Sequence, residues 1–419
     1  MTQALVASAI PAVEARRTAA WIASLFAASV LLQRISVPGG VVPLLLPLTY
    51  AWVGYGLATG ILELDRLRVR LLLLAAAVTA GMTLVQSVMV VQPLISVTSW
   101  GLFMAVWAPA ALRLVDRDRD ALRSALVYVV AIGRWLAGAC VAMMLLQFAG
   151  VRYVDYLAAV VPPSLQLQGY VITYPLDYLS TVYRANAWIG LEPSIVSLQI
   201  GVCLVVALLL RSGVPTLLLL AAGLASTMSG SGFVVVLVGV VVMALTPIRS
   251  HMWRQGLWAA GGLVALLLTP FGQTMLMRIG EVGVEGSSTS LRAVEPYRLL
   301  WPQWASDVVS VVVGRGPGAS QALIESTNVS GLLVPSPIKV FFDYGVVGGV
   351  LLAAYLLFCY LGGPSTSLAI GLLVSSWLLQ PGTTTVVLVL PTLLLITWWA
   401  PRTGQTIEAE PLARVGPGT

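Results

Sequence analysis

Residues 194–247 read SIVSLQIGVCLVVALLLRSGVPTLLLLAAGLASTMSGSGFVVVLVGVVVMALTP, and Arg211 is the only charged residue among them. A helix needs about 20 apolar residues to cross a hydrocarbon layer of about 30 Å. The stretch therefore predicts membrane helices that follow one another closely. Its last two apolar runs are short and flank Ser229–Gly232, which indicates either a pair of helices meeting at the membrane surface or one long broken helix.

The same character extends over the whole chain. Of its 419 residues 58% are hydrophobic and only 10% are charged, and the mean hydropathy is +0.92. A soluble domain carries about 25% charged residues because water covers its surface. We therefore expect an all-α fold, a polytopic integral membrane helical bundle of about twelve transmembrane segments. The predicted segments are 19–33, 38–62, 71–91, 94–112, 122–149, 194–210, 214–228, 232–247, 255–271, 336–360, 365–380 and 383–400.

We interpret residues 1–419 as one transmembrane domain with two long outer segments. Arginines are concentrated in the short loops of one side, and such loops lie in the cytoplasm. This places both termini in the cytoplasm and the long segments outside. The regions are 19–149 (N-terminal helices), 150–193 (first outer segment), 194–271 (central helices), 272–335 (second outer segment), 336–400 (C-terminal helices) and 401–419 (cytoplasmic tail).

Composition also limits the chemistry. The net charge of +6 is spread over short loops, so we expect no nucleic-acid partner. Cys140, Cys203 and Cys359 lie in apolar segments without paired spacing, and the only histidine, His251, lies in a cytoplasmic loop. No metal site and no cofactor are predicted.

The end of the first outer segment holds two candidate site residues. Arg184 precedes the sequence Gly190-Leu191-Glu192-Pro193-Ser194, at which the chain re-enters the membrane. Glu192 is either a helix-capping carboxylate or a general base. The tyrosines of this segment are either interface anchors or surfaces on which sugar rings stack.

The second outer segment carries Arg292 and Arg298, followed by Trp301 and Trp304. The planar guanidinium of arginine donates two parallel hydrogen bonds to phosphate and keeps its charge. The two arginines therefore predict either a site for a pyrophosphate or nonspecific contacts with lipid headgroups. The tryptophans are anchors at the interface or a platform for a glycan.

Three further candidates follow. Arg315 lies in the turn Gly314-Arg315-Gly316-Pro317-Gly318. Lys339 and Asp343 are four residues apart at the start of an apolar segment, where they form either a helical pair or part of a reaction site.

Taken in this order, these motifs resemble the O-antigen polymerase and O-antigen ligase superfamily of bacterial membrane glycosyltransferases. The resemblance covers about residues 190–350. It is carried by Gly190–Ser194, the small-residue apex Ser229–Gly232, the segment around Arg292–Trp304, the Gly-Arg-Gly-Pro-Gly turn and Asp343-Tyr344-Gly345.

The resemblance implies an inverting, metal-independent transfer from a glycan on a polyprenyl pyrophosphate to a glycan acceptor, at the outer face of a bacterial inner membrane. Arg292, and with it Arg298, match the arginines that hold the pyrophosphate in that superfamily. Glu192 is the first candidate for the base and Asp343 the second; Arg184, Arg315, Lys339, Trp301 and Trp304 are candidates for substrate binding. A chain-length regulator or another polysaccharide-assembly protein is a further possible partner, beside the lipid bilayer.

Two departures from the family pattern bear on function. Many members have an arginine in the apex, where this chain has Gly230, and Arg184 is a candidate substitute. Ligases usually have a histidine near residues 336–339, and here there is none. A polymerase is therefore favoured over a ligase. Two further classes of function stay open from the sequence: a transporter or flippase of lipid-linked sugars, and a non-catalytic scaffold.

Overall fold

The computed structural model describes residues 2–90, 94–115, 119–176, 180–245, 261, 290–327, 329, 332–378, 383–399 and 406–407. Within them the chain is mostly helical, as predicted. Every predicted membrane segment within these residues contains a helix. The predicted segment 255–271 lies outside the described residues apart from residue 261. The long helices are α1 (Thr2–Leu31), α2 (Leu45–Ala58), α3 (Arg66–Met89), α4 (Val97–Trp107), α5 (Arg119–Phe148), α7 (Pro193–Leu209), α8 (Val214–Ser226), α9 (Gly230–Leu245), α16 (Ser336–Leu361), α17 (Thr366–Leu378) and α18 (Thr383–Thr397).

In the part of the chain that the structure describes, three helices are both long and apolar enough to cross a membrane: α3, α5 and α16. Shorter apolar helices are also present, among them α4, α7, α8 and α9. The membrane character of the chain is thus supported, whereas the number of spans and their orientation stay predictions.

The chain reverses direction at the apex Ser229–Gly232. Gly232, in the first turn of α9, lies against Ser197 of α7, and two turns later Gly239 lies against Val205. Because α9 begins beside the beginning of α7 and runs in the same direction, α8 must carry the chain back between them. The interpretation as two helices that meet at the apex is confirmed, and the single broken helix is excluded.

A small β-ribbon departs from the all-α prediction. Strands β1 (Leu62–Leu64) and β2 (Leu112–Leu114) pair in antiparallel register, with Glu63 opposite Arg113. The 3-10 helix η1 (Ala108–Ala111) leads into β2. Leu114 N–H donates to the carbonyl of Trp398, so the ribbon is also joined to the end of α18. Each strand has only three residues, too few for a periodic pattern to predict it.

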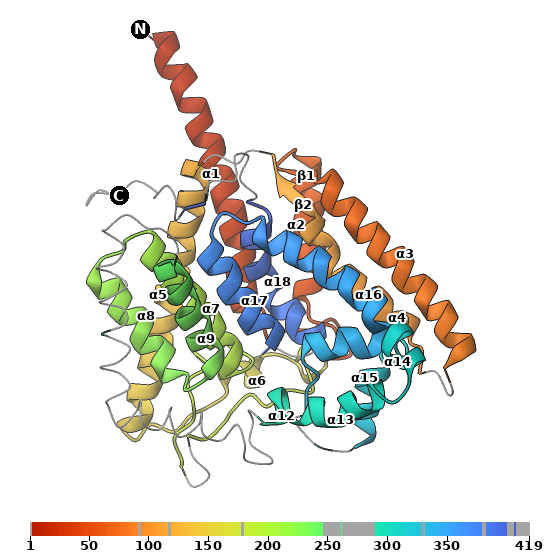
Figure 1. Ribbon diagram of the computed structural model, residues 1–419. Coiled ribbons are helices and arrows are strands. Elements are labelled where there is room, and N and C mark those ends of the chain that lie inside the picture. Colours follow the sequence, from red (N-terminus) through yellow and green to blue (C-terminus); the bar gives the residue numbers. More distant parts are fainter. Residues whose placement is uncertain are drawn as a thin grey trace.

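The two segments predicted to be external lie at the same end of the bundle, opposite the N-terminus and the β-ribbon (Figure 1). The first contains α6 (Tyr156–Val160) and the 3-10 helix η2 (Pro163–Leu165). The described part of the second contains α12 (Ser290–Ala293), α13 (Glu295–Trp304), α14 (Val308–Val313) and α15 (Ala319–Ser326). Buried side chains of α13, α15 and the start of α16 form a small core of their own, which includes Leu300, Ile324 and Phe342.

Candidate functional site

Glu192 lies at the junction between the first outer segment and α7. The residue before a proline is restricted to extended backbone, and Glu192 has φ −135° and ψ 149°, with Pro193 opening the helix. Its side chain is not the N-terminal cap of the helix; instead Ser194 Oγ donates to its carboxylate at 3.0 Å. Glu192 therefore stands in the capping position without acting as a side-chain cap, and it is only 5% exposed.

The apex Ser229–Gly232 packs directly on this junction. Ser231 Oγ donates to the carbonyl of Ser194 at 2.9 Å, and Ser197 Oγ donates to the carbonyl of Ser229 at 2.8 Å. Gly232 N–H in turn donates to Ser197 Oγ at 3.0 Å. Two motifs that are far apart in the sequence thus form one hydrogen-bonded unit beside Glu192.

Small residues are required for this approach. A Cβ atom on Gly232 would collide with the carbonyl of Ser197, and one on Gly201 would collide with the backbone of Gly232. Glycine permits such close backbone contact because it has no side chain. The packing of α9 on α7 therefore explains Gly201 and Gly232 without any direct role in chemistry.

The loop that leads to Glu192 is strained. Ala187 and Trp188 have φ values of 56° and 60°, which cost about 1–3 kcal/mol each for residues other than glycine. The buried Asn186 holds this turn, since its Oδ1 accepts from Trp188 N–H at 3.0 Å and its Nδ2 donates to the carbonyl of Ile172 at 3.2 Å. Strain of this kind persists only where neighbouring contacts impose it, and it is common at functional sites.

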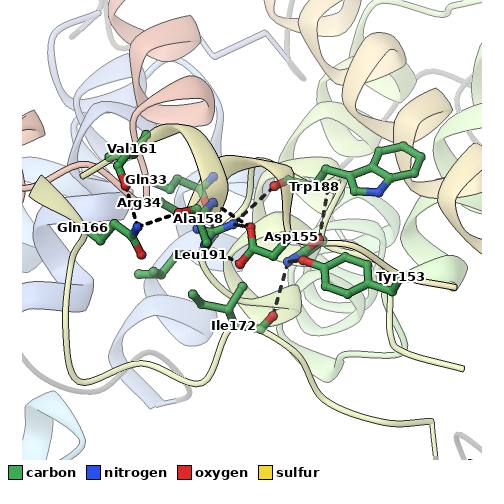
Figure 2. Close-up of polar contacts among 11 residues, drawn as sticks. Gln33, Arg34, Tyr153, Asp155, Ala158, Val161, Gln166, Ile172, Trp188 and Leu191 are labelled. Atoms are coloured by element: carbon green, nitrogen blue, oxygen red, sulfur yellow. Dashed lines mark hydrogen bonds and ion pairs between the residues drawn. The ribbon is translucent and has the colours of Figure 1, made fainter. Parts of the chain in front are cut away.

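Two consecutive residues after α1 contact the same loop (Figure 2). Gln33 Oε1 accepts from Leu191 N–H at 3.1 Å. Arg34 forms a two-pronged ion pair with Asp155, and its Nη1 also lies 3.5 Å from the carbonyl of Trp188. Arg34 is 1% exposed.

Asp155 is held as a carboxylate. Burial acts to raise its pKa, but hydrogen bonds from Arg34 and from Ala158 N–H act the other way, and the net result is a pKa below the usual value. The Asp155 carboxylate also begins α6 by accepting from Ala158 N–H. The ion pair therefore joins the first outer segment to the end of α1.

Arg184 lies near the apex. Its guanidinium carbon is 5.4 Å from the centre of the Tyr174 ring, a cation–π distance. The next residue, Ala185, donates its N–H to the carbonyl of Ser226 at the end of α8. Arg184 thus reaches the neighbourhood of the apex from the outer segment.

Asp343 and Lys339 form a second, fully buried group. Lys339 Nζ lies 2.9 Å from Asp343 Oδ2, and the carboxylate also accepts from the N–H groups of Gly318 and Ser320 at the start of α15. Lys339 Nζ is 3.4 Å from Ser320 Oγ as well. Of the two alternatives that the sequence left open, the structure shows the helical pair, and this pair fastens the Gly-Arg-Gly-Pro-Gly turn to α16.

Helix α16 is interrupted where this turn meets it. Gly345 has φ 66° and ψ −173°, so the helical hydrogen bonding stops there. The carbonyls of Phe342 and Asp343 accept instead from Arg315 N–H and Gly316 N–H, and Gln86 Nε2 donates to the carbonyl of Asp343 at 2.9 Å. Buried backbone groups away from water need such partners, and the turn supplies them.

Arg315 holds the segment before the turn. Its Nη2 donates to the carbonyl of Gln303 at 2.7 Å and to Ser306 Oγ at 2.9 Å, and it lies 3.8 Å from Asp307. Hydrogen bonds from the N–H and the hydroxyl of Ser310 keep the pKa of Asp307 below its usual value.

The remaining candidates lie on α12 and α13. The side chain of Arg298 is 57% exposed and pairs with Glu295 at 3.2 Å. Trp301 is exposed and contacts the buried Trp304 edge to face, with 5.0 Å between ring centres. Arg292 belongs to α12, but its side chain lies outside the described residues.

The predicted site residues therefore fall into two groups at one end of the bundle. Glu192 and Arg184 lie with the apex; Asp343, Lys339 and Arg315 form the second group, beside α13 with Arg298, Trp301 and Trp304. Sequence reasoning missed Gln33, Arg34, Asp155 and Gln86. Of these four residues, only Arg34 gave a signal in the sequence. It lies in a short loop predicted to be external, whereas the other arginines predicted on that side lie in or beside the two long segments.

Comparisons with known proteins add no relative: no family model matches the chain, and neither a curated protein nor a solved structure matches it.

Proposed function

We propose that the chain is a membrane glycosyltransferase that polymerises an oligosaccharide carried on a polyprenyl pyrophosphate, at the external face of a bacterial inner membrane. A hydroxyl oxygen of the acceptor glycan attacks the anomeric carbon of the donor and forms the new glycosidic bond. The bond between that carbon and the pyrophosphate oxygen breaks, and polyprenyl pyrophosphate leaves. The hydroxyl proton passes to a carboxylate.

One observation supports this proposal most strongly. The carboxylate of Glu192 is buried beside the hydrogen-bonded unit of Ser194, Ser197 and the apex, at the end of a strained loop. It occupies the capping position of α7 without a side-chain capping hydrogen bond, so a cap of that kind does not account for a carboxylate there. A base held in fixed geometry at such a junction suits proton abstraction from a hydroxyl, a contribution of about 10²–10⁴ in rate.

Asp343 suits the role of base less well. Three donors already occupy its two oxygens: Lys339 and the N–H groups of Gly318 and Ser320. We therefore assign to Asp343 and Lys339 the positioning of the second outer segment. Proton transfer is assigned to Glu192 because of its place beside Ser194 and the apex.

Cationic side chains on that segment would receive the pyrophosphate. Arg298 is exposed and engaged in a surface pair with Glu295, and such pairs contribute only about 0–1 kcal/mol. Replacing the Glu295 carboxylate by a phosphate of the donor therefore costs little free energy. We assign Arg292 to pyrophosphate binding together with Arg298. Trp301 has an exposed ring on which a sugar can stack.

The test is a deletion of the gene in its host, with complementation by variants and separation of the surface polysaccharide and the lipid-linked intermediates. We expect Glu192→Gln to abolish long chains and to accumulate single lipid-linked repeats. Glu325→Gln, an exposed glutamate of α15, is the matched control and should restore the wild-type ladder. Arg298→Ala should shorten the chains, with the exposed Arg152→Ala as its control.

Other outcomes would favour a different activity. Normal chains that fail to reach their final acceptor would indicate a ligase, and repeats trapped on the cytoplasmic side would indicate a flippase. Full polymerisation by the Glu192→Gln variant would refute the assignment of the base.

A further inference from the structure

We infer that Gln33 and Arg34 are positioning residues for Glu192: together they fix the strained loop 187–191 that presents its carboxylate. The role of the loop in catalysis rests on the proposed function. That the two side chains hold the loop rests on the contacts alone (Figure 2).

Gln33 is the middle of a buried chain of hydrogen bonds with a defined direction. Gln199 Nε2 donates to the carbonyl of Ser29 at 3.1 Å, so its Oε1 is the atom that accepts from Gln33 Nε2, at 2.7 Å. The remaining atom of the Gln33 amide, Oε1, accepts from Leu191 N–H at 3.1 Å. Because an amide has one donor end and one acceptor end, Ser29 on α1 determines through two glutamines which atom faces Leu191.

Arg34 supplies the second point of attachment. Asp155 fixes its guanidinium plane by contacts with both terminal nitrogens at 2.6 Å, and Nη1 faces the carbonyl of Trp188. The loop is thus held at two points: Gln33 accepts a hydrogen bond from Leu191 N–H, and Arg34 donates one to the carbonyl of Trp188. These anchors come from neighbouring residues of the turn after α1.

The anchors act together with Asn186, which holds the turn at Ala187 and Trp188. Without the anchors, the strained backbone at these two residues loses part of its support, and the residues that follow shift. A displacement of about 1 Å in a reacting group costs about 10² in rate. The anchors lie in the group around Glu192 and not in the group around Arg298, so their loss should affect turnover and leave donor binding unchanged.

The experiment combines kinetics with a measurement that does not depend on activity. Gln33→Leu and Arg34→Leu are compared with wild type in the full-length protein, in a transfer assay with a lipid-linked donor. In parallel Leu191, which is fully buried, is replaced by cysteine and treated with a membrane-impermeant maleimide. Leu300→Cys, equally buried in the second segment, reports any general unfolding, and the native cysteines are buried.

We expect each leucine variant to lower kcat at least about tenfold, with KM changed less than about threefold, because the base and not the donor site is displaced. Labelling at position 191 should rise at least about tenfold, without labelling at position 300. Asp155→Asn, which keeps shape and one acceptor, should give a smaller effect in the same direction and serves if the leucine variants fail to fold.

Unchanged labelling at position 191, or increased labelling with unchanged kcat, would overturn the inference. Wild-type turnover by Glu192→Gln would refute the proposed base instead, while the labelling result would still decide whether the anchors hold the loop.

Discussion

Arg34 and Asp155, which are 121 residues apart in the sequence, face each other with Nη1–Oδ1 and Nη2–Oδ2 distances of 2.6 Å each. This parallel geometry is the strongest form of an arginine–carboxylate contact. One partner is almost completely buried and the other is about one quarter exposed. The pair therefore connects the turn after α1 to the first outer segment. If it is broken, the main unfavourable term is the buried charge of Arg34 left without its partner.

Asp155→Ala should destabilise the protein substantially. It leaves the guanidinium of Arg34 buried without its carboxylate, and breaking a buried pair costs about 3–5 kcal/mol; because Asp155 is partly exposed, we expect about 2–4 kcal/mol. Thermal unfolding in detergent measures the effect. Glu63→Ala, which breaks the more exposed pair with Arg113 on the β-ribbon, is the control and should cost at most about 1 kcal/mol. Equal effects of the two variants would contradict the prediction.

The same pair should give a defined dependence of stability on pH. The folded pKa of Asp155 is depressed, so its ionised form stabilises the fold above the unfolded pKa of about 3.9. That contribution is lost as the pH falls through the lower, folded value. The difference in melting temperature between wild type and Asp155→Asn should therefore stay constant from about pH 8 to pH 5 and shrink below about pH 4. A difference that narrows already between about pH 7 and pH 6 would show that another group is responsible.

Gly345→Ala should be strongly destabilising. A Cβ atom at this position would collide with the carbonyl of Val312 and the N–H of Gly314, and the left-handed φ adds strain of about 1–3 kcal/mol. Gly138→Ala in α5 is the matched control, since nothing lies within 4 Å of its added Cβ. We expect the control to be neutral or stabilising by up to about 1 kcal/mol. Similar melting temperatures for both variants would exclude the close packing of the turn on α16.

Lys339 and Asp343 should be coupled in stability and dispensable as acid–base groups. Lys339→Met leaves a buried carboxylate with only its backbone donors, which we expect to cost about 2–4 kcal/mol. Together with Asp343→Asn and the double variant, it forms a cycle whose coupling energy should exceed about 1.5 kcal/mol.

Activity separates the two roles of Asp343. Among molecules of Asp343→Asn that fold, kcat should remain within about tenfold of wild type, whereas a general base contributes about 10²–10⁴. A loss of more than about 100-fold in folded protein would transfer the role of base from Glu192 to Asp343.

Particular residues show how far the sequence alone reaches. The apolar runs predicted the long helices that the structure describes, because the distance across a bilayer and the need to satisfy backbone groups inside it leave few other structures. The short polar apex at Ser229–Gly232 correctly predicted a meeting of two helices. The four-residue spacing of Lys339 and Asp343 allowed either a helical pair or a place in a reaction site, and the structure shows the pair, because side chains at that spacing are neighbours on a helix.

Only the tertiary structure decided how these local features combine. The contact of Ser231 with Ser194, the attachment of Leu191 to Gln33, and the supply of N–H groups from Arg315 and Gly316 to the interrupted α16 all join residues that are distant in the sequence. Such contacts depend on which helix faces which, and nearly uniform apolar helices carry little periodic signal that would specify this. The amino-acid sequence by itself therefore determined a membrane-type helical chain and its candidate residues, whereas the packing of those helices decided which candidates lie together, which are already engaged in structure, and where the buried Arg34 belongs.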